Sequence, residues 1–224
     1  TGWHHYTIVW DQGSAANSEI YIDGVANIAT DTGTIGNVGD LSNALTFRLG
    51  AESDNGNPFD GKLDEARIYN RVLTVSEIQA LYDSSAPDKT NSSVATPQGT
   101  GRLDSGLVGY WPLDSTAGTS FQSSSTNTIT GTMNNMEDPT DWTTGQIGGG
   151  LDFGGTDEYV SFTASTPLDN ITETITISAW VKVNSTSGYI VSKSGGAGDD
   201  QYKLSLNTDR KVGFATANGH TTSS

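Results

Sequence analysis

The chain has 224 residues, a third of them hydrophobic, which is enough to form one large domain or two small ones. It carries 26 Asp or Glu residues but only 11 Lys or Arg, and the net charge of −15 disfavours nucleic acids and anionic membrane surfaces as partners. There is no cysteine, so disulfides, thiolate metal sites and cysteine nucleophiles are excluded. With 27 glycines and many Ser, Thr, Asn and Asp residues, the composition favours short strands joined by polar turns, and we expect an all-β fold.

The first part of the chain predicts strands. GWHHYTIVWD alternates in the manner of a buried strand, and ALTFRLGAE and GKLDEARIYNR are two further strands. EIYIDGVANI surrounds the dipeptide Asp23-Gly24, which accepts the positive φ angles of a type I′ turn, and it therefore predicts a hairpin.

The spacing of the apolar residues then changes from that of a strand to that of a helix, and RVLTVSEIQALY predicts one short helix. Thr74 and Glu77 have the spacing of a capping box, and Leu73 can pack onto Ile78 as a hydrophobic staple. We expect this helix to cover one end of the sheets, with Ile78 and Leu81 facing inward.

Residues 86–105 contain two prolines and almost no apolar side chains, and they predict a linker or a long exposed loop. Strands resume with GLVGYWPLD and GGGLDFGGTDEYVSF, and the Ser, Thr and Asn-rich stretch between these two segments predicts a long loop. ITISAWVKV places its apolar residues on one face of a strand, and three shorter strands, GYIVSK, DQYKLSLN and KVGFATA, follow.

In this order, GLVGYWPLD, GGGLDFGGTDEYVSF, ITISAWVKV, YIVSKSGG and YKLSLNTDRKVGF resemble the first half of a laminin-G-like domain of the concanavalin A-like jelly-roll type. GWHHYTIVWD, EIYIDGV, LTFRLGAE and FDGKLDEARIYNRVLTVSEIQALY resemble the second half. The resemblance implies an antiparallel β-sandwich with one short helix. The two halves stand in exchanged order.

We therefore expect residues 1–85 to be the second half of the domain, residues 86–105 the linker, and residues 106–224 the first half. We expect them to form together one circularly permuted domain, which is feasible because termini in such folds usually lie at the surface and close together, so that a linker can join the old ends. The alternative is that the sequence comes from an array of repeats and contains the halves of two neighbouring copies. Each half would then complete a domain with a half of another chain, and this exchange would build dimers, rings or fibres.

Some relatives of this fold are glycanases, and these need two carboxylates that face each other across a cleft. The sequence has no alternating Glu-x-Asp-x-x-Glu-like strand. Asp64 and Glu65 are adjacent, so on a regular strand they point to opposite faces and cannot line one cleft. His4 and His5 also point to opposite faces, and we expect one packed and one half-exposed histidine in place of a metal site or proton relay. We expect no enzymatic activity.

Five tryptophans could supply a stacking platform for sugar rings. By alternation, Trp3 and Trp111 belong to the core. Trp180 lies opposite the apolar face of its strand and Trp142 lies in the polar segment EDPTDWTTG, so these two are the candidate ligand-binding residues. The alternative for each is packing against a loop or a second sheet.

Oxygen ligands for a hard cation are the strongest chemical signal in so acidic a chain. In similar jelly-roll domains a structural calcium is often held by an Asp near the start of the domain and by the Asp of a late Asp-x-x-Arg-x-Tyr-like strand. The resemblance matches these positions to Asp114 and Asp64, with Asp157 as a third candidate, and Glu65 is expected to pair with Arg67 or a hydroxyl. The alternative is that these carboxylates cap backbone amides.

From these features we predict a non-catalytic extracellular adhesion or carbohydrate-binding module, stabilised by calcium, with a glycan or a cell-surface protein as its partner. The alternative is a structural subunit of a repeat array or surface filament, joined by swapped half-domains. The acidic, lysine-poor composition is typical of secreted bacterial surface proteins, and no apolar run is long enough to insert into a membrane.

Overall fold

The computed structural model of the chain describes residues 2–14, 17–27, 30–31, 41–53, 55–85, 103–163, 165–184, 188–195, 200–206, 211–216 and 221–223. Most of the predicted linker, residues 86–102, lies outside these described residues.

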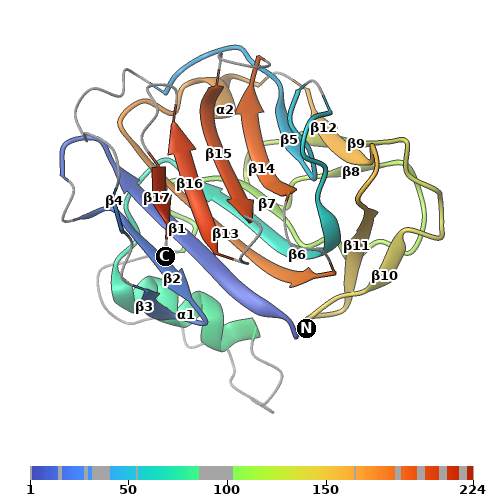
Figure 1. Cartoon of the computed structure of the whole chain (residues 1–224), viewed down its shortest axis with the longest axis horizontal. Helices are drawn as coiled ribbons and strands as arrows, with labels where there is room; N and C mark the ends of the chain where they lie inside the picture. Colours follow the sequence, from blue (N-terminus) through green and yellow to red (C-terminus); the bar gives the residue numbers. More distant parts are fainter. Residues whose placement is uncertain are drawn as a thin grey trace.

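Two antiparallel sheets face each other (Figure 1), and the predicted all-β sandwich is confirmed. Sheet A runs in the order β10 (Trp142–Thr144), β11 (Gly149–Gly154), β6 (Asp60–Tyr69), β13 (Thr174–Val183), β1 (His4–Asp11), β2 (Glu19–Ile22) and β3 (Val25–Asn27), and β7 (Leu107–Trp111) also pairs with β6. Sheet B runs in the order β4 (Thr30–Asp31), β17 (Thr221–Ser223), β16 (Val212–Thr216), β15 (Asp200–Leu206), β14 (Gly188–Ser194), β5 (Phe47–Leu49), β12 (Tyr159–Phe162), β9 (Thr130–Asn134) and β8 (Ser120–Gln122).

Strands from the two parts of the chain alternate within both sheets. In sheet A, β6 lies between β11 and β13, and β1 pairs with β13 along its whole length. In sheet B, β5 lies between β14 and β12. A single hydrophobic core therefore contains side chains from both sides of residues 86–102.

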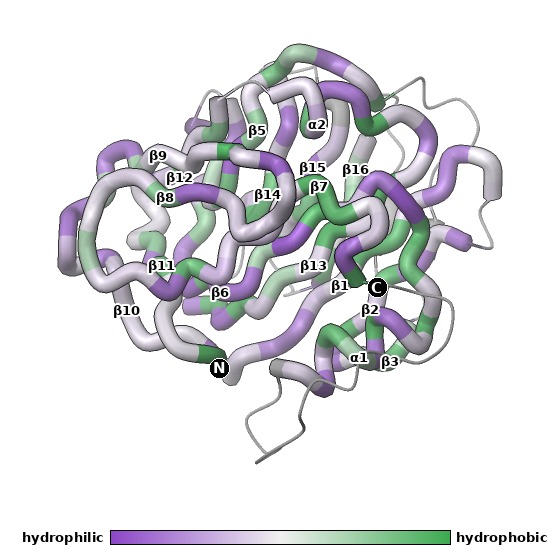
Figure 2. The backbone as a smooth tube through the Cα atoms, turned by 180° about the vertical axis from the view of Figure 1, so that it is seen from behind, coloured by the Kyte–Doolittle hydropathy of each residue, from purple (hydrophilic) through white to green (hydrophobic). Residues whose placement is uncertain are grey.

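The core lies between the sheets and follows the two-residue period of the strands. On β13, Ile175, Ile177, Ala179 and Val181 face inward and are buried, as predicted. The alternation of hydrophobic and hydrophilic residues is visible along the tube in Figure 2. Trp111 is fully buried in this core, as predicted, whereas Trp3 is only partly buried.

The helix α1 (Val75–Ser85) begins at the predicted capping box. The Thr74 backbone N–H donates to Glu77 Oε2 at 2.8 Å, and the Glu77 N–H donates to Thr74 Oγ1 at 3.3 Å. Leu73, Ile78 and Leu81 pack against the outer face of sheet A in a second, smaller apolar cluster. This helix therefore covers one part of that face (Figure 1).

Other local predictions are also confirmed. Asp23 and Gly24 have φ angles of 53° and 76°, and they connect β2 to β3 in the predicted hairpin. The stretch before β11 was predicted to be a long loop, but it contains the short strands β8, β9 and β10. A second helix of one turn, α2 (Thr166–Asp169), was not predicted from the sequence.

Candidate functional site

A β-bulge in β6 changes the relation between Asp64 and Glu65. Asp64 pairs with Trp180 and Arg67 pairs with Ser178, so the intervening Glu65 and Ala66 face a single residue of β13. Glu65 is the extra residue, with a φ angle of 56°. Asp64 and Glu65 therefore both lie on the outer face of sheet A, and the prediction that they point to opposite faces is wrong.

The Glu65 carboxylate belongs to a buried polar network. It forms an ion pair with Arg67, as predicted, and both its oxygens accept from the Tyr110 hydroxyl at 2.9 and 3.0 Å. The Arg67 guanidinium lies 4.0 Å from the centre of the Tyr110 ring. With its oxygens occupied in this way, Glu65 has a structural role.

Asp64 is fully buried but has little to compensate its charge. Its Oδ2 atom accepts the Ile147 backbone N–H at 2.8 Å, and its Oδ1 atom is buried without a hydrogen-bond partner. Burial raises the pKa of the Asp64 carboxyl to about 7, although the hydrogen bond from Ile147 opposes this shift. An acceptor atom left in this state is costly unless another group binds it.

Asp114 contacts the backbone two residues after Ile147. Its Oδ1 atom accepts the Gly149 backbone N–H at 2.8 Å. A β-carbon added to Gly148 would lie 2.3 Å from Asp114 Oδ1, and one added to Gly145 would lie 2.7 Å from Asp64 Oδ2. Residues 145–149, which we call the 145–149 loop, connect β10 to β11 and include the first residue of β11. Because this loop is rich in glycine, its backbone can lie close to both carboxylates.

Among the described residues, no group of three or more His, Asp or Glu side chains is assembled to hold a metal ion. Asp64 and Asp114 are two carboxylates that both accept hydrogen bonds from the backbone of the 145–149 loop. Asp157, the third residue predicted from the sequence, lies in the turn between β11 and β12, where it is exposed and accepts from Asn135 Nδ2 at 3.1 Å. No contact found in the described part of the chain links Asp157 to the 145–149 loop.

An open hollow of about 830 Å³ lies beside Asp114. Its wall is about equally polar and apolar, and it includes several hydroxyl groups. The residues that line it are Asp114, Ser115, Thr116, Trp142, Thr143, Thr144, Gly148 and Gly149.

Trp142 forms part of this wall. Its indole N–H donates to the Gly118 carbonyl at 2.8 Å, and its ring packs edge-on against Phe121. The side chain is largely buried, with 8% of the residue exposed. Trp142 is therefore a fixed wall of the hollow and not a freely exposed platform.

Trp180, the other candidate, lies beneath α1. Its ring stacks on Tyr82 at 5.7 Å and lies 5.3 Å from the ring of His5, and only 2% of the residue is exposed. Trp180 is therefore a packing residue, but it packs against helix α1 and not against a loop or a second sheet, which was the alternative expected from the sequence. The two predicted aromatic residues are thus not brought together in one surface.

The two histidines differ as predicted. His4 is exposed and its Nδ1 atom lies 2.8 Å from Asp23 Oδ2, whereas His5 is fully buried with Nε2 2.8 Å from Ser178 Oγ. Burial, together with the nearby positive charge of Arg67, lowers the pKa of His5 to about 3. A neutral, enclosed His5 is a packing residue.

Sequence reasoning missed a row of three charged residues, of which Lys62 contacts the wall of the hollow. Lys62 donates to Thr143 Oγ1 at 2.7 Å and forms an ion pair with Asp152 at 3.1 Å. Lys182 is directly opposite Lys62 on the neighbouring strand. Only the pairing of β6 with β11 and β13 brings these groups together, so no local motif could have revealed them.

These features define a β-sandwich with an open hollow at one end of sheet A. Residues 1–79 match a laminin-G family model described as the concanavalin A-like lectin/glucanases superfamily. Residues 1–79 are therefore similar to this superfamily, as the sequence motifs predicted, and the antiparallel sandwich is consistent with that similarity. No curated protein and no solved structure matches the chain.

The fold of this superfamily is one that serves carbohydrate binding or adhesion. Neither helix of the described residues has the length and apolar character needed to cross a membrane.

Proposed function

We propose that the protein is a non-catalytic carbohydrate-binding module of the cell exterior, which binds a glycan in the hollow beside Asp114 and is stabilised there by calcium. The observation that carries this proposal is that Asp64 and Asp114 both accept backbone hydrogen bonds from the glycine-rich loop that also borders the hollow. The cell-exterior location rests on the composition and on the superfamily match.

The residues at the loop fit a calcium ion in their chemistry. Calcium takes carboxylate and carbonyl oxygens and is tolerant of irregular geometry. Asp64 supplies a buried oxygen without a partner, Asp114 supplies an exposed carboxylate, and residues 145–149 supply backbone carbonyls. When bound, the ion would neutralise the two carboxylates and connect β6 and the segment after β7 to this loop.

A glycan fits the hollow for a different reason. Sugars present hydroxyl groups that need hydrogen-bond partners and apolar faces that pack on aromatic rings. Ser115, Thr116 and Thr144 supply exposed polar groups, and Trp142 supplies the aromatic wall. The calcium site lies at the rim through Asp114.

A binding role is favoured over hydrolysis by the state of the carboxylates. Asp114 is the one carboxylate among the residues that line the hollow. Asp64 is fully buried, and Glu65 is occupied by Arg67 and Tyr110. A glycosidase needs two carboxyl groups that reach the substrate from opposite sides.

The test is a glycan array probed in calcium and in chelator, followed by a reducing-sugar assay on every polysaccharide bound. We expect binding that is stronger in calcium and no release of reducing ends. Trp142→Ala should abolish this binding, whereas Trp180→Ala, which removes another buried indole under α1, should retain it at a temperature where both variants are folded. Release of reducing sugar, or equal loss in both variants, would contradict the proposal.

A further inference from the structure

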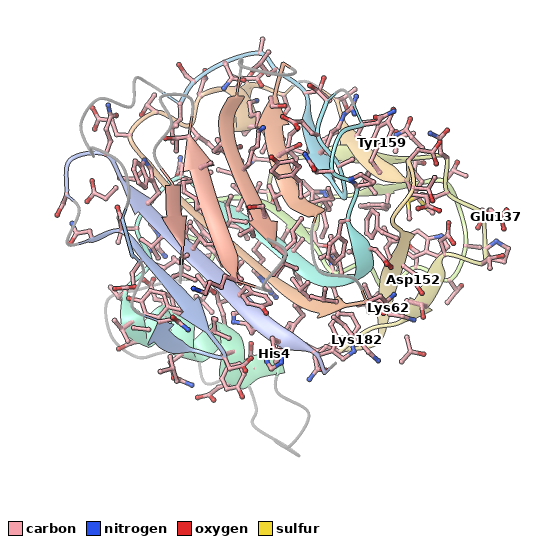
Figure 3. The ribbon with its side chains drawn as sticks, in the orientation of Figure 1. His4, Lys62, Glu137, Asp152, Tyr159 and Lys182 are labelled. Atoms are coloured by element: carbon pink, nitrogen blue, oxygen red, sulfur yellow. The ribbon has the colours of Figure 1, made fainter. Side chains whose placement is uncertain are left out.

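Three charged side chains form a row across the outer face of sheet A. Asp152 on β11 pairs with Lys62 on β6, and Lys62 pairs in turn with Lys182 on β13. Figure 3 shows the three residues together at one end of the sheet. Like charges directly opposite each other on neighbouring strands destabilise a sheet, so the Lys62–Lys182 pair is a cost to the fold.

Lys182 differs from the other cations of the protein. Within the described ranges, every other lysine and arginine has a hydrogen bond, an ion pair or another electrostatic contact, as in the pairs of Lys193 with Asp169 and of Lys203 with Glu52. No such partner is found for the Lys182 ammonium among these residues. Its three N–H donors are therefore available to an anion.

Of the two lysines, Lys62 also contacts the wall of the hollow. Lys62 Nζ donates to Thr143 Oγ1, and Thr143 is one of the residues that line the hollow. Lys62 keeps a third donor after its bonds to Thr143 and Asp152. A ligand that contacts Thr143 in the hollow would therefore lie close to Lys62, and Lys182 stands opposite Lys62 on the neighbouring strand.

We propose that Lys62 and Lys182 bind the carboxylate of an acidic sugar, so that the glycan recognised by the hollow contains a uronic acid. This inference rests on the proposed function. The row of Asp152, Lys62 and Lys182 has a net charge of +1, which matches one carboxylate. A polymer with a negative charge on every unit fits poorly, because a chain with a net charge of −15 repels it everywhere else, whereas a single uronic acid within a neutral glycan adds only one such charge.

The test uses uronic-acid oligosaccharides, each paired with its carboxyl-reduced neutral form, in a titration against the whole chain at fixed ionic strength. We expect the acidic member to bind about tenfold more tightly, because hydrogen bonds to a charged group are roughly twice as strong as neutral ones. Lys182→Gln should reduce this preference towards one. The control is Lys211→Gln, an exposed lysine just before β16 in sheet B, which should retain it.

The possible outcomes separate the two proposals. Equal binding of the acidic and neutral forms by the unmutated protein would overturn the uronic-acid inference and leave the glycan-binding function standing. A preference that survives Lys182→Gln and a Lys62→Gln variant would also overturn it, since the acidic group would then be recognised elsewhere. Absence of binding by either form would contradict the proposed function itself and the inference that rests on it.

Discussion

The outer face of sheet A has one end that is covered by α1 and one end that is open, and the two ends differ in how their polar side chains are paired. At the covered end, α1 lies over His5, Ser178 and Trp180, and these side chains pack against one another. At the open end, Asp64 is buried with one oxygen unpaired, Asp114 is exposed, and Lys182 is partly buried. The ends meet where Trp180 pairs with Asp64.

This difference shows how one sheet face can divide its roles. The covered end excludes charge, since burial keeps His5 neutral. The open end collects groups whose charges lack full compensation, and groups of this kind are candidates for ligand binding. The same strands, β6 and β13, supply both ends, so position relative to α1 decides the role of a side chain.

Separating the chain into residues 1–85 and 106–224 should have the largest effect, because each end needs strands from both pieces. The covered end pairs β1 with β13, and the open end pairs β6 with β11. Each piece alone would expose sheet edges and an apolar face, so neither should fold. NMR dispersion and a cooperative unfolding transition in either isolated piece would contradict a shared core.

Trp180→Ala should destabilise the covered end most among single substitutions there. Removing the indole leaves a cavity between His5 and Tyr82, and we expect a loss of about 3–5 kcal/mol in the free energy of unfolding. Denaturant unfolding measures this loss. A change below about 1 kcal/mol would mean that α1 does not hold this end as tightly as a packed core holds its residues.

Acid should weaken the covered end through His5. The pKa of His5 is about 3 in the folded state and about 6.5 in a model peptide, so folding favours the neutral form. The stabilisation is complete above pH 6.5 and is lost as the pH falls towards 3, at up to about 1.4 kcal/mol per pH unit. Asp23, Arg67 and Tyr82 surround this group.

The measurement compares the unmutated protein with a His5→Gln variant from pH 7 to pH 3. Titration of the other groups occurs in both proteins, so the difference in unfolding free energy isolates His5. We expect this difference to shrink as the pH falls. A difference that stays constant would show that His5 does not titrate with a lowered pKa.

Several features were predictable from the sequence because they are local. The capping box of Thr74 and Glu77 and the turn at Asp23-Gly24 involve residues within a few positions of one another. The inward face of β13 follows from simple alternation. These patterns, together with the family motifs, were sufficient to predict the β-sandwich fold.

The bulge at Glu65 could not be predicted in this way. No glycine marks the positive φ angle at that position, so alternation assigned Asp64 and Glu65 to opposite faces. The approach of residues 145–149 to Asp64 depends on the pairing of β11 with β6 across more than 80 positions. The enclosure of Trp180 likewise depends on where α1 returns to the sheet.

Calcium should act on the open end alone. Because the ion would bind the folded state, it should stabilise by about 2.7 kcal/mol when its concentration is a hundred times the dissociation constant. Asp64→Asn and Asp114→Asn should each lose most of this gain. Asp157→Asn, which alters an exposed carboxylate in another turn, should keep it and serves as the matched control.

The most direct test of the open end as a calcium site is the melting temperature of the unmutated protein in calcium and in chelator. We predict a higher melting temperature in calcium, and no such rise for Asp64→Asn or Asp114→Asn. Magnesium at the same concentration should give a smaller rise, because it demands near-ideal octahedral geometry. Identical melting temperatures in calcium and in chelator would contradict the account and would leave Asp64 and Asp114 as carboxylates that only accept hydrogen bonds from the 145–149 loop.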